Sequence, residues 1–146
     1  RKLATPAGRR LCEELLEPLQ DRFGRLTIRS AYRSRDVNEL GWRLQKEGKK
    51  GYNCASNEQN AAAHIWDMLD ADGRMGAMAC VVVPSFYDAH PEPGGWQGLA
   101  RWIHDNLNYS TLYFFPTCWA VNIGWHERPQ RRIDSYAEPK GRWIPN

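Results

Sequence analysis

Two histidines of this sequence lie close to carboxylates, and the residue types of both pairs suit chemistry. His64 precedes Asp67 by three residues, and His126 is followed directly by Glu127. A zinc hydrolase needs three protein ligands, an open position for water and a nearby carboxylate as base. His64, Asp67 and His126 could supply the ligands, and Glu127 the base. The same imidazoles and carboxylates could also perform acid–base catalysis without a metal.

A structural role is the third alternative for these histidines. His64 would then be a packed polar residue, and His126 would lie at the rim of a basic loop that continues with arginines at positions 128, 131 and 132. Residue types alone leave a metal site, a metal-free catalytic site and a structural role open. The choice depends on the elements that position these side chains.

The first segment has the pattern of an amphipathic helix over residues 6–23. Thr5-Pro6 offers a hydroxyl N-cap followed by a proline at the first helical position. Leucines recur every four residues from position 11 to position 19, which is the spacing of one helix face. Pro18 should kink this helix or end it early, and Gly24 should close it.

The remaining periodicities predict one α+β domain over residues 1–146, in which a small antiparallel sheet is backed by helices. Residues 57–68 give mixed signals, because three consecutive alanines favour a helix. From Arg128 onward we expect a basic tail (residues 128–146) that could hold a short helix. The other expected helices span residues 36–45 and 96–107, and the expected strands span 26–29, 76–83, 112–115 and 119–125, the last two as a hairpin.

Leu16-Glu-Pro-Leu19 and Phe23-Gly24 precede the first expected strand, and Ser30-Ala-Tyr-Arg-Ser34 then leads to Asn38. This order of motifs resembles the opening of the zinc DD-carboxypeptidases, which are peptidoglycan peptidases of the Hedgehog/DD-peptidase fold in bacteria and phages. The resemblance covers about residues 10–126 and is most specific over residues 16–38. It implies a hydrolase of peptide or peptidoglycan-like substrates.

The resemblance also implies where zinc ligands should lie, and two of these positions are degenerate. Family members have a histidine, an aspartate seven residues later, and a second histidine on a late strand, with an acid two residues beyond it. Asp67 fits the aspartate, and the resemblance puts residues 65–67 on a strand. Asn60 and Asn122 stand where the histidines would be, and Gly124 stands at the acid. Asparagine is a poor zinc ligand beside imidazole.

His64 and His126 each lie four residues after one of these asparagines. A shift by four residues along a strand displaces a ligand by about 13 Å, because each two-residue step covers about 6.6 Å. Asp67 would have to reach both histidines. We therefore favour no bound cofactor, with zinc at His64, Asp67 and His126 as the alternative. We expect Asn60 and Asn122 to line one cleft beside Asp67 and to contact the substrate.

Arg33 and Ser34 belong to the motif that carries the resemblance, and we expect both to bind the substrate. In the family the arginine grips the terminal carboxylate of the substrate, a task that suits its planar, two-pronged donor set. The resemblance thus implies that Arg33 and Asp67 face one cleft, and a structural ion pair between them is the alternative. Cys54 should lie near this cleft, either as a thiol nucleophile beside a histidine or as a buried loop anchor.

Composition narrows the classes of partner. The 146 residues are 42% hydrophobic and 25% charged, as in an ordinary globular domain. The net charge of +3 permits an acidic partner but lacks the basic stripe of a dedicated DNA-binding domain, so nucleic acid is not the favoured ligand. No apolar stretch is long enough for a membrane span.

The cysteines bear on the compartment. Four cysteines without a C-x-x-C pair argue against a zinc ribbon and favour reduced thiols in a cytoplasmic protein. A secreted protein is the alternative, because the first residue is Arg rather than Met.

Two function classes remain. The first is a peptidase-like hydrolase with a remodelled active site, in which His64, Asp67, His126 and Glu127 are catalytic. The second is a binding or effector protein that kept the cleft, lost zinc and binds a peptide, a glycan or a nucleic acid. A fold by itself cannot choose between these classes.

Overall fold

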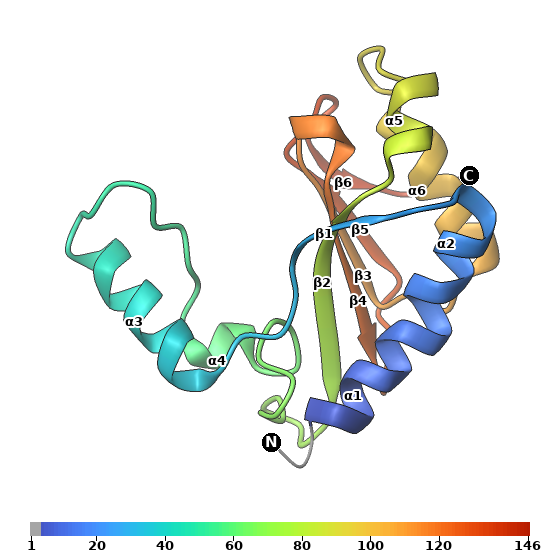
Figure 1. Ribbon diagram of the computed structural model, residues 1–146. Coiled ribbons are helices and arrows are strands. Elements are labelled where there is room, and N and C mark those ends of the chain that lie inside the picture. Colours follow the sequence, from blue (N-terminus) through green and yellow to red (C-terminus); the bar gives the residue numbers. More distant parts are fainter. Residues whose placement is uncertain (1–3) are drawn as a thin grey trace.

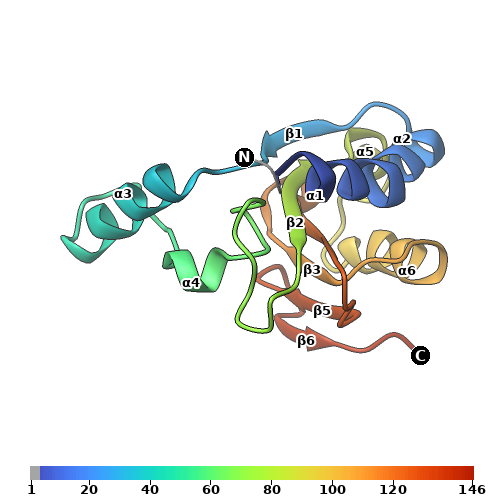
Figure 2. The same ribbon diagram turned by 90° about the horizontal axis from the view of Figure 1, so that it is seen from below.

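One mixed sheet organises the computed structural model, which describes residues 4–146. The strands lie in the order β1-β2-β4-β3-β5-β6, and neighbours are antiparallel except for the parallel pair β3 and β5. Helices cover one face of this sheet (Figures 1 and 2), so the predicted α+β class is confirmed. The strands are β1 (Thr27–Ser30), β2 (Gly76–Val82), β3 (Thr111–Phe114), β4 (Val121–His126), β5 (Arg132–Ser135) and β6 (Gly141–Trp143).

The N-terminal helix runs without a break through Pro18. It consists of α1 (Ala4–Leu11), a π-helical stretch (Cys12–Leu16) and α2 (Glu17–Phe23). Proline has no N–H to donate to the carbonyl four residues earlier. For Pro18 this is the carbonyl of Glu14, which lies in the π-helical stretch directly before α2. The expectation that Pro18 ends the helix early is therefore wrong. Gly24, with φ of 84°, ends the helix as predicted.

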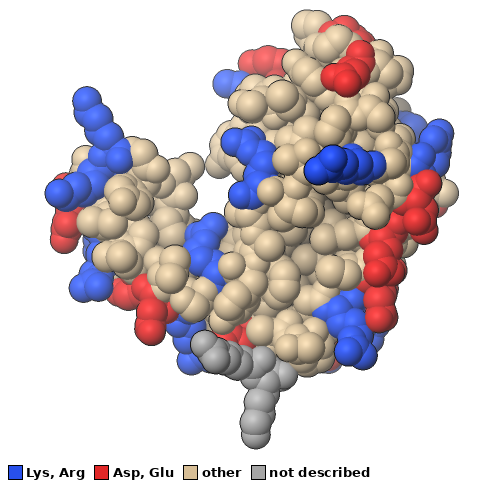
Figure 3. All heavy atoms as spheres, viewed as in Figure 1, with Lys and Arg blue, Asp and Glu red and all other residues tan. Residues whose placement is uncertain are grey.

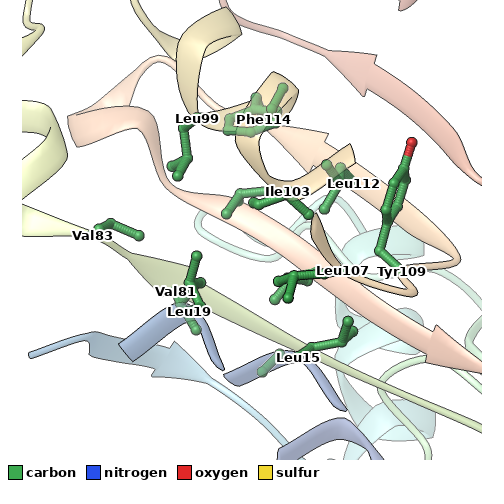
Figure 4. Packing of buried hydrophobic residues seen from close by; sticks show 14 of the residues in the cluster. Leu15, Leu19, Val81, Val83, Leu99, Ile103, Leu107, Tyr109, Leu112 and Phe114 are labelled. Carbon is green, nitrogen blue, oxygen red and sulfur yellow. The ribbon is translucent and has the colours of Figure 1, made fainter. Parts of the chain in front are cut away.

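The hydrophobic core lies between the sheet and the helices α1, α2 and α6 (Trp96–Asn106). Figure 4 shows Leu15 and Leu19 of the N-terminal helix, and Leu99 and Ile103 of α6, close to strand residues such as Val81 and Leu112. All four helix residues belong to one core cluster on the same face of the sheet. These four side chains are at most 1% exposed. The short helix α5 (Pro84–Ala89) follows β2 at the edge of the core. The leucine periodicity of the sequence therefore identified the buried helix faces correctly.

The C-terminal segment belongs to the sheet. Residues 128–146 were expected to form a basic tail that could hold a short helix, but they contain β5 and β6. Burial alternates along β5, where Ile133 and Ser135 are buried between the more exposed Arg132 and Asp134. The expected helix is wrong because this period of two, together with pairing to the distant strand β3, outweighs the local density of charge.

Residues 33–54 stand away from this core. Figure 1 shows α3 (Arg35–Lys46) projecting to the side opposite the N-terminal helix, with the short helix α4 (Asn57–Asn60) beneath it. The strand expected at residues 65–67 is not formed, and only an isolated bridge joins Ala61 to Ile65. In the described part of the chain no helix is long and apolar enough to cross a membrane.

Candidate functional site

A cavity of about 750 Å³ lies between the segment that contains α4 and the sheet face that the helices leave uncovered. The uncovered face is set by alternation along β4, where Val121 and Ile123 are buried and Asn122 points to the other side. Cross-strand pairing places Cys80 and Tyr113 on either side of Asn122. The sheet thus forms a floor that presents Asn122 and Tyr113 to the cavity.

Asn60 lines the same cavity as Asn122, but Asp67, which the resemblance places beside them, is not among the lining residues. Ser56 and Gln59 cap the first turn of α4 reciprocally, and this fixes the position of Asn60 at the end of the helix. Asn60 is 8% exposed, and its Nδ2 donates to Asn38 Oδ1 at 2.8 Å. Its amide nitrogen therefore has a structural partner, whereas Asn122 lies half-buried on the open floor.

His64 also lines the cavity and is 8% exposed. Burial, and after it the charge of Arg33, lower the pKa of its imidazole to about 4, although a backbone hydrogen bond at Ala31 opposes both effects. The ring is therefore neutral at physiological pH. Among residues 4–146, His64 Nδ1 has no hydrogen-bond partner, so this buried atom is left for a ligand or a water molecule.

His126 lies at the rim of the cavity with both ring nitrogens engaged. Nδ1 accepts a hydrogen bond from the backbone N–H of Arg128 at 2.9 Å, so the proton sits on Nε2, which donates to Asp70 Oδ2 at 2.7 Å. Asp70 also accepts from the backbone N–H groups of Asp72 and Arg74. The hydrogen bond from Arg74, followed by that from His126, holds the pKa of Asp70 below its ordinary value.

Glu127 and Asp67 lie apart from the cavity's lining residues. Glu127 Oε1 accepts from the backbone N–H of Met75 at 2.7 Å, and this bond ties the end of β4 to the start of β2. Tyr32 donates its hydroxyl proton to Asp67 Oδ2 at 3.0 Å, and Arg35 donates to the Asp67 carbonyl at 3.1 Å. The structure thus brings His64 and His126 to one cavity but does not bring Asp67 and Glu127 there.

Arg33, Ser34 and Cys54 belong to a second environment centred on Asn38, which is fully buried. Arg33 Nη1 donates to Asn38 Oδ1 at 3.0 Å, and the thiol of Cys54 lies 3.2 Å from the same oxygen. Ser34 is the N-cap of α3, where its hydroxyl accepts from the N–H of Val37. Arg33 therefore pairs with an amide, and the bond to the Asp67 segment comes from Arg35 instead.

The lining of the cavity carries both neutral and charged polar side chains. In the described range 4–146, no group of three or more His, Cys, Asp and Glu side chains is placed to hold a metal ion. All four cysteines lie in the described range and are free. The charged side chains of the lining are four carboxylates and one guanidinium, from Glu58, Asp70, Asp72, Asp134 and Arg132.

Sequence reasoning missed Asp70 and Tyr113. Asp70 begins an Asp-Ala-Asp-Gly turn, and such a turn signal could have placed its carboxylate on backbone N–H groups. Tyr113 stacks on Tyr136 with ring centroids 4.5 Å apart. A hydrogen bond with Tyr136, aided by burial, raises the pKa of Tyr113 to about 12, so it meets a ligand as a neutral hydroxyl.

No protein-family model, curated protein or solved structure matches this chain. The likeness to zinc DD-carboxypeptidases thus remains a prediction from the motifs at residues 16–38.

Proposed function

We propose that this protein is a metal-independent binding domain, which holds a neutral cell-wall-like ligand rich in hydroxyl and amide groups in the cavity over the open sheet face. One observation carries the proposal: Asn60 and Asn122 line one cavity at the two positions that the resemblance gives to ligand histidines, while Asp67 lies outside it. Amide side chains bind hydroxyl and amide groups well and zinc poorly.

The state of the two histidines supports binding over hydrolysis. A general base is most effective when its pKa lies near the working pH, whereas the pKa of His64 is about 4. His126 would have to break its bond to Asp70 or to the Arg128 N–H before it could accept a substrate proton. Neither imidazole is therefore arranged as a catalytic base.

The chemistry of the lining supports a neutral ligand. A volume of 750 Å³ suits a ligand of small-molecule size. Four carboxylates against one arginine disfavour an anion. Amide and hydroxyl side chains, including Gln59, Thr111 and Gln130, offer both donors and acceptors. An N-acetylated sugar presents the matching hydroxyl and amide groups, and the resemblance points to the cell wall that contains such sugars.

Calorimetric titration with tri-N-acetylchitotriose tests this proposal. Asn122→Leu should weaken binding about tenfold, because it removes the amide and keeps the same branched shape. The midpoint of thermal unfolding should not change, since Asn122 is half-buried and no hydrogen bond within residues 4–146 engages its side chain. Asn108→Leu is the matched control, because Asn108 is exposed and lies outside the cavity.

Two results would contradict the proposal. Equal affinity of the wild type and Asn122→Leu would remove the cavity floor from the binding site. Cleavage of a peptidoglycan peptide by the wild-type protein, abolished by a chelator, would favour the hydrolase instead. Chelator should leave trisaccharide binding unchanged if the proposal holds.

A further inference from the structure

The segment of residues 33–54, here called the arm, has an apolar face that the rest of the described chain does not cover. Val37 is 60% exposed, Leu40 is 51% exposed and Tyr52 is 48% exposed. Asn38 is the only buried residue of α3, and the main hydrophobic core contains no residue of the arm. Figure 3 shows the arm as a lobe separated by a notch from the body of the molecule.

Tertiary packing does not explain why α3 is amphipathic. Val37, Leu40 and Leu44 follow the i, i+3, i+7 spacing of one helix face. A helix of 12 residues is only marginally stable in water by itself. The arm is held by the cap at Ser34 and by the hydrogen bonds of Asn38, and both leave its apolar face open. Exposed apolar surface of this kind is typical of an interaction site.

The apolar face is concave. A cavity of about 330 Å³ lies between α3 and the loop at residues 51–54, with Val37, Leu40 and Leu44 on one wall and Tyr52 on the other. Arg33 also lines it and adds a cationic group to an apolar lining. This shape suits the insertion of one apolar side chain from a partner, as in the recognition of amphipathic peptides by grooves.

The arm carries all of the net charge of the chain. It contains six Lys and Arg residues against three Asp and Glu residues, which gives +3. The whole chain has 20 against 17, also +3, so the residues outside the arm are balanced. The basic side chains of the arm are those of Arg33, Arg35, Arg43, Lys46, Lys49 and Lys50.

We propose that the arm is a docking site for an acidic segment of another protein, which inserts an apolar side chain between α3 and Tyr52 and sets carboxylates against the surrounding lysines and arginines. Charge complementarity selects this occupant. A second copy of this chain would present either its own basic arm or the residues outside the arm, which have no net charge. A flat anionic membrane would meet a concave surface on which Asp36, Glu39 and Glu47 are also present.

A random dodecapeptide library displayed on phage, panned against the full-length protein, provides the probe. We expect enriched peptides to combine an aromatic or aliphatic residue with flanking Asp or Glu. Fluorescence anisotropy with a synthetic copy of one such peptide then gives its Kd. Leu40→Glu should weaken binding about tenfold or more, because it places a carboxylate in the apolar cavity. Its unfolding midpoint should match that of the wild type, since Leu40 is half-exposed.

Matched variants separate the apolar contribution from the ionic one. Ile144→Glu, a change of the same kind at a residue 77% exposed outside the arm, should bind the peptide as the wild type does. The double variant Lys49→Glu and Lys50→Glu should bind several-fold more weakly at low salt, with a smaller deficit at high salt. Trisaccharide binding should persist in all three variants, so this inference and the proposed function fail independently.

Four outcomes would overturn the inference. Enriched peptides without acidic residues would show that the occupant is not an acidic segment. Equal affinity of an enriched peptide for the wild type and Leu40→Glu would show that the arm is not its site. A dimer in sedimentation velocity that Leu40→Glu dissociates would assign the surface to a second copy. Co-sedimentation with vesicles of phosphatidylcholine and phosphatidylserine, lost in Leu40→Glu, would assign it to a membrane.

Discussion

The cavity and the arm differ in charge, in shape and in what holds them. The cavity has an excess of carboxylates and is built on a sheet whose other face packs into the main core. The arm is basic and apolar, and its principal anchor is one buried asparagine. A site on a packed sheet keeps its geometry without a ligand. A site on a weakly anchored helix can adjust to a partner.

Truncation of a leucine in the core should lower the free energy of unfolding far more than truncation of a leucine in the arm. Leu15→Ala should lower the free energy of unfolding by about 3 kcal/mol, because Leu15 is fully buried in the core and its truncation leaves a cavity. Leu40→Ala in the arm should change it by less than about 0.5 kcal/mol. Urea unfolding measures both values. Similar losses of unfolding free energy in the two variants would show that Leu40 is packed as tightly as the core leucine.

His64 should make the body sensitive to acid. Its pKa is about 4 in the folded protein and 6.5 as a free side chain, so the unfolded chain binds more protons between these values. The free energy of unfolding should therefore fall as the pH falls from 6.5 to 4, by an amount on the order of 3 kcal/mol from this residue. His64→Gln should flatten this part of the pH profile in urea unfolding.

The difference between the pH profiles of the wild type and His64→Gln isolates His64 from the carboxylates that titrate in the same range, because both proteins contain these carboxylates. A profile that His64→Gln leaves unchanged would mean that the ring is not buried as described.

Loss of Asn38 should release the arm while the sheet stays intact. Asn38 Nδ2 donates to Ala55 O and Asn57 Oδ1, and Asn38 Oδ1 accepts from Arg33 and Asn60. Asn38→Ala should therefore cost about 2 kcal/mol of local stability. Hydrogen exchange should accelerate at residues 35–54 and remain slow in β4. Uniform acceleration in both regions would show that the arm and the body unfold together.

Much of the fold could be predicted because local signals and tertiary packing agree there. The leucine spacing of the N-terminal helix and the apolar run of β2 both face the core. β5 was missed, since its pairing with β3 is nonlocal and its charged residues resemble a loop. The helix expected at residues 36–45 is present as α3, but the amphipathicity of a helix does not say whether the protein itself covers the apolar face.

The candidate site was predicted only in part, for a related reason. Asn60 falls at the end of α4, and Asn122 and His126 fall on β4, so their direction follows from helix and strand periodicity, whereas His64 lies in a turn. Asp67 and Asp70 lie three residues apart in an irregular segment, and only Asp70 bonds to His126. Which carboxylate reaches His126 depends on the left-handed backbone at Ala62 and on the turn at Asp70. Periodicity carries no information about such turns.

Substitution of Glu127 by glutamine should have little effect on stability or binding. The result separates a structural role of this carboxylate from a catalytic one. Glu127→Gln replaces the carboxylate oxygen by an amide oxygen that can still accept from the Met75 N–H, so the free energy of unfolding should change by less than about 0.5 kcal/mol. Trisaccharide affinity should also be unchanged, since Glu127 is not among the residues that line the cavity. Glu127→Ala is the paired variant: it leaves the Met75 N–H without its acceptor and should cost about 1 kcal/mol. A catalytic base would behave differently, because Glu127→Gln would then abolish activity while leaving the unfolding curve in place.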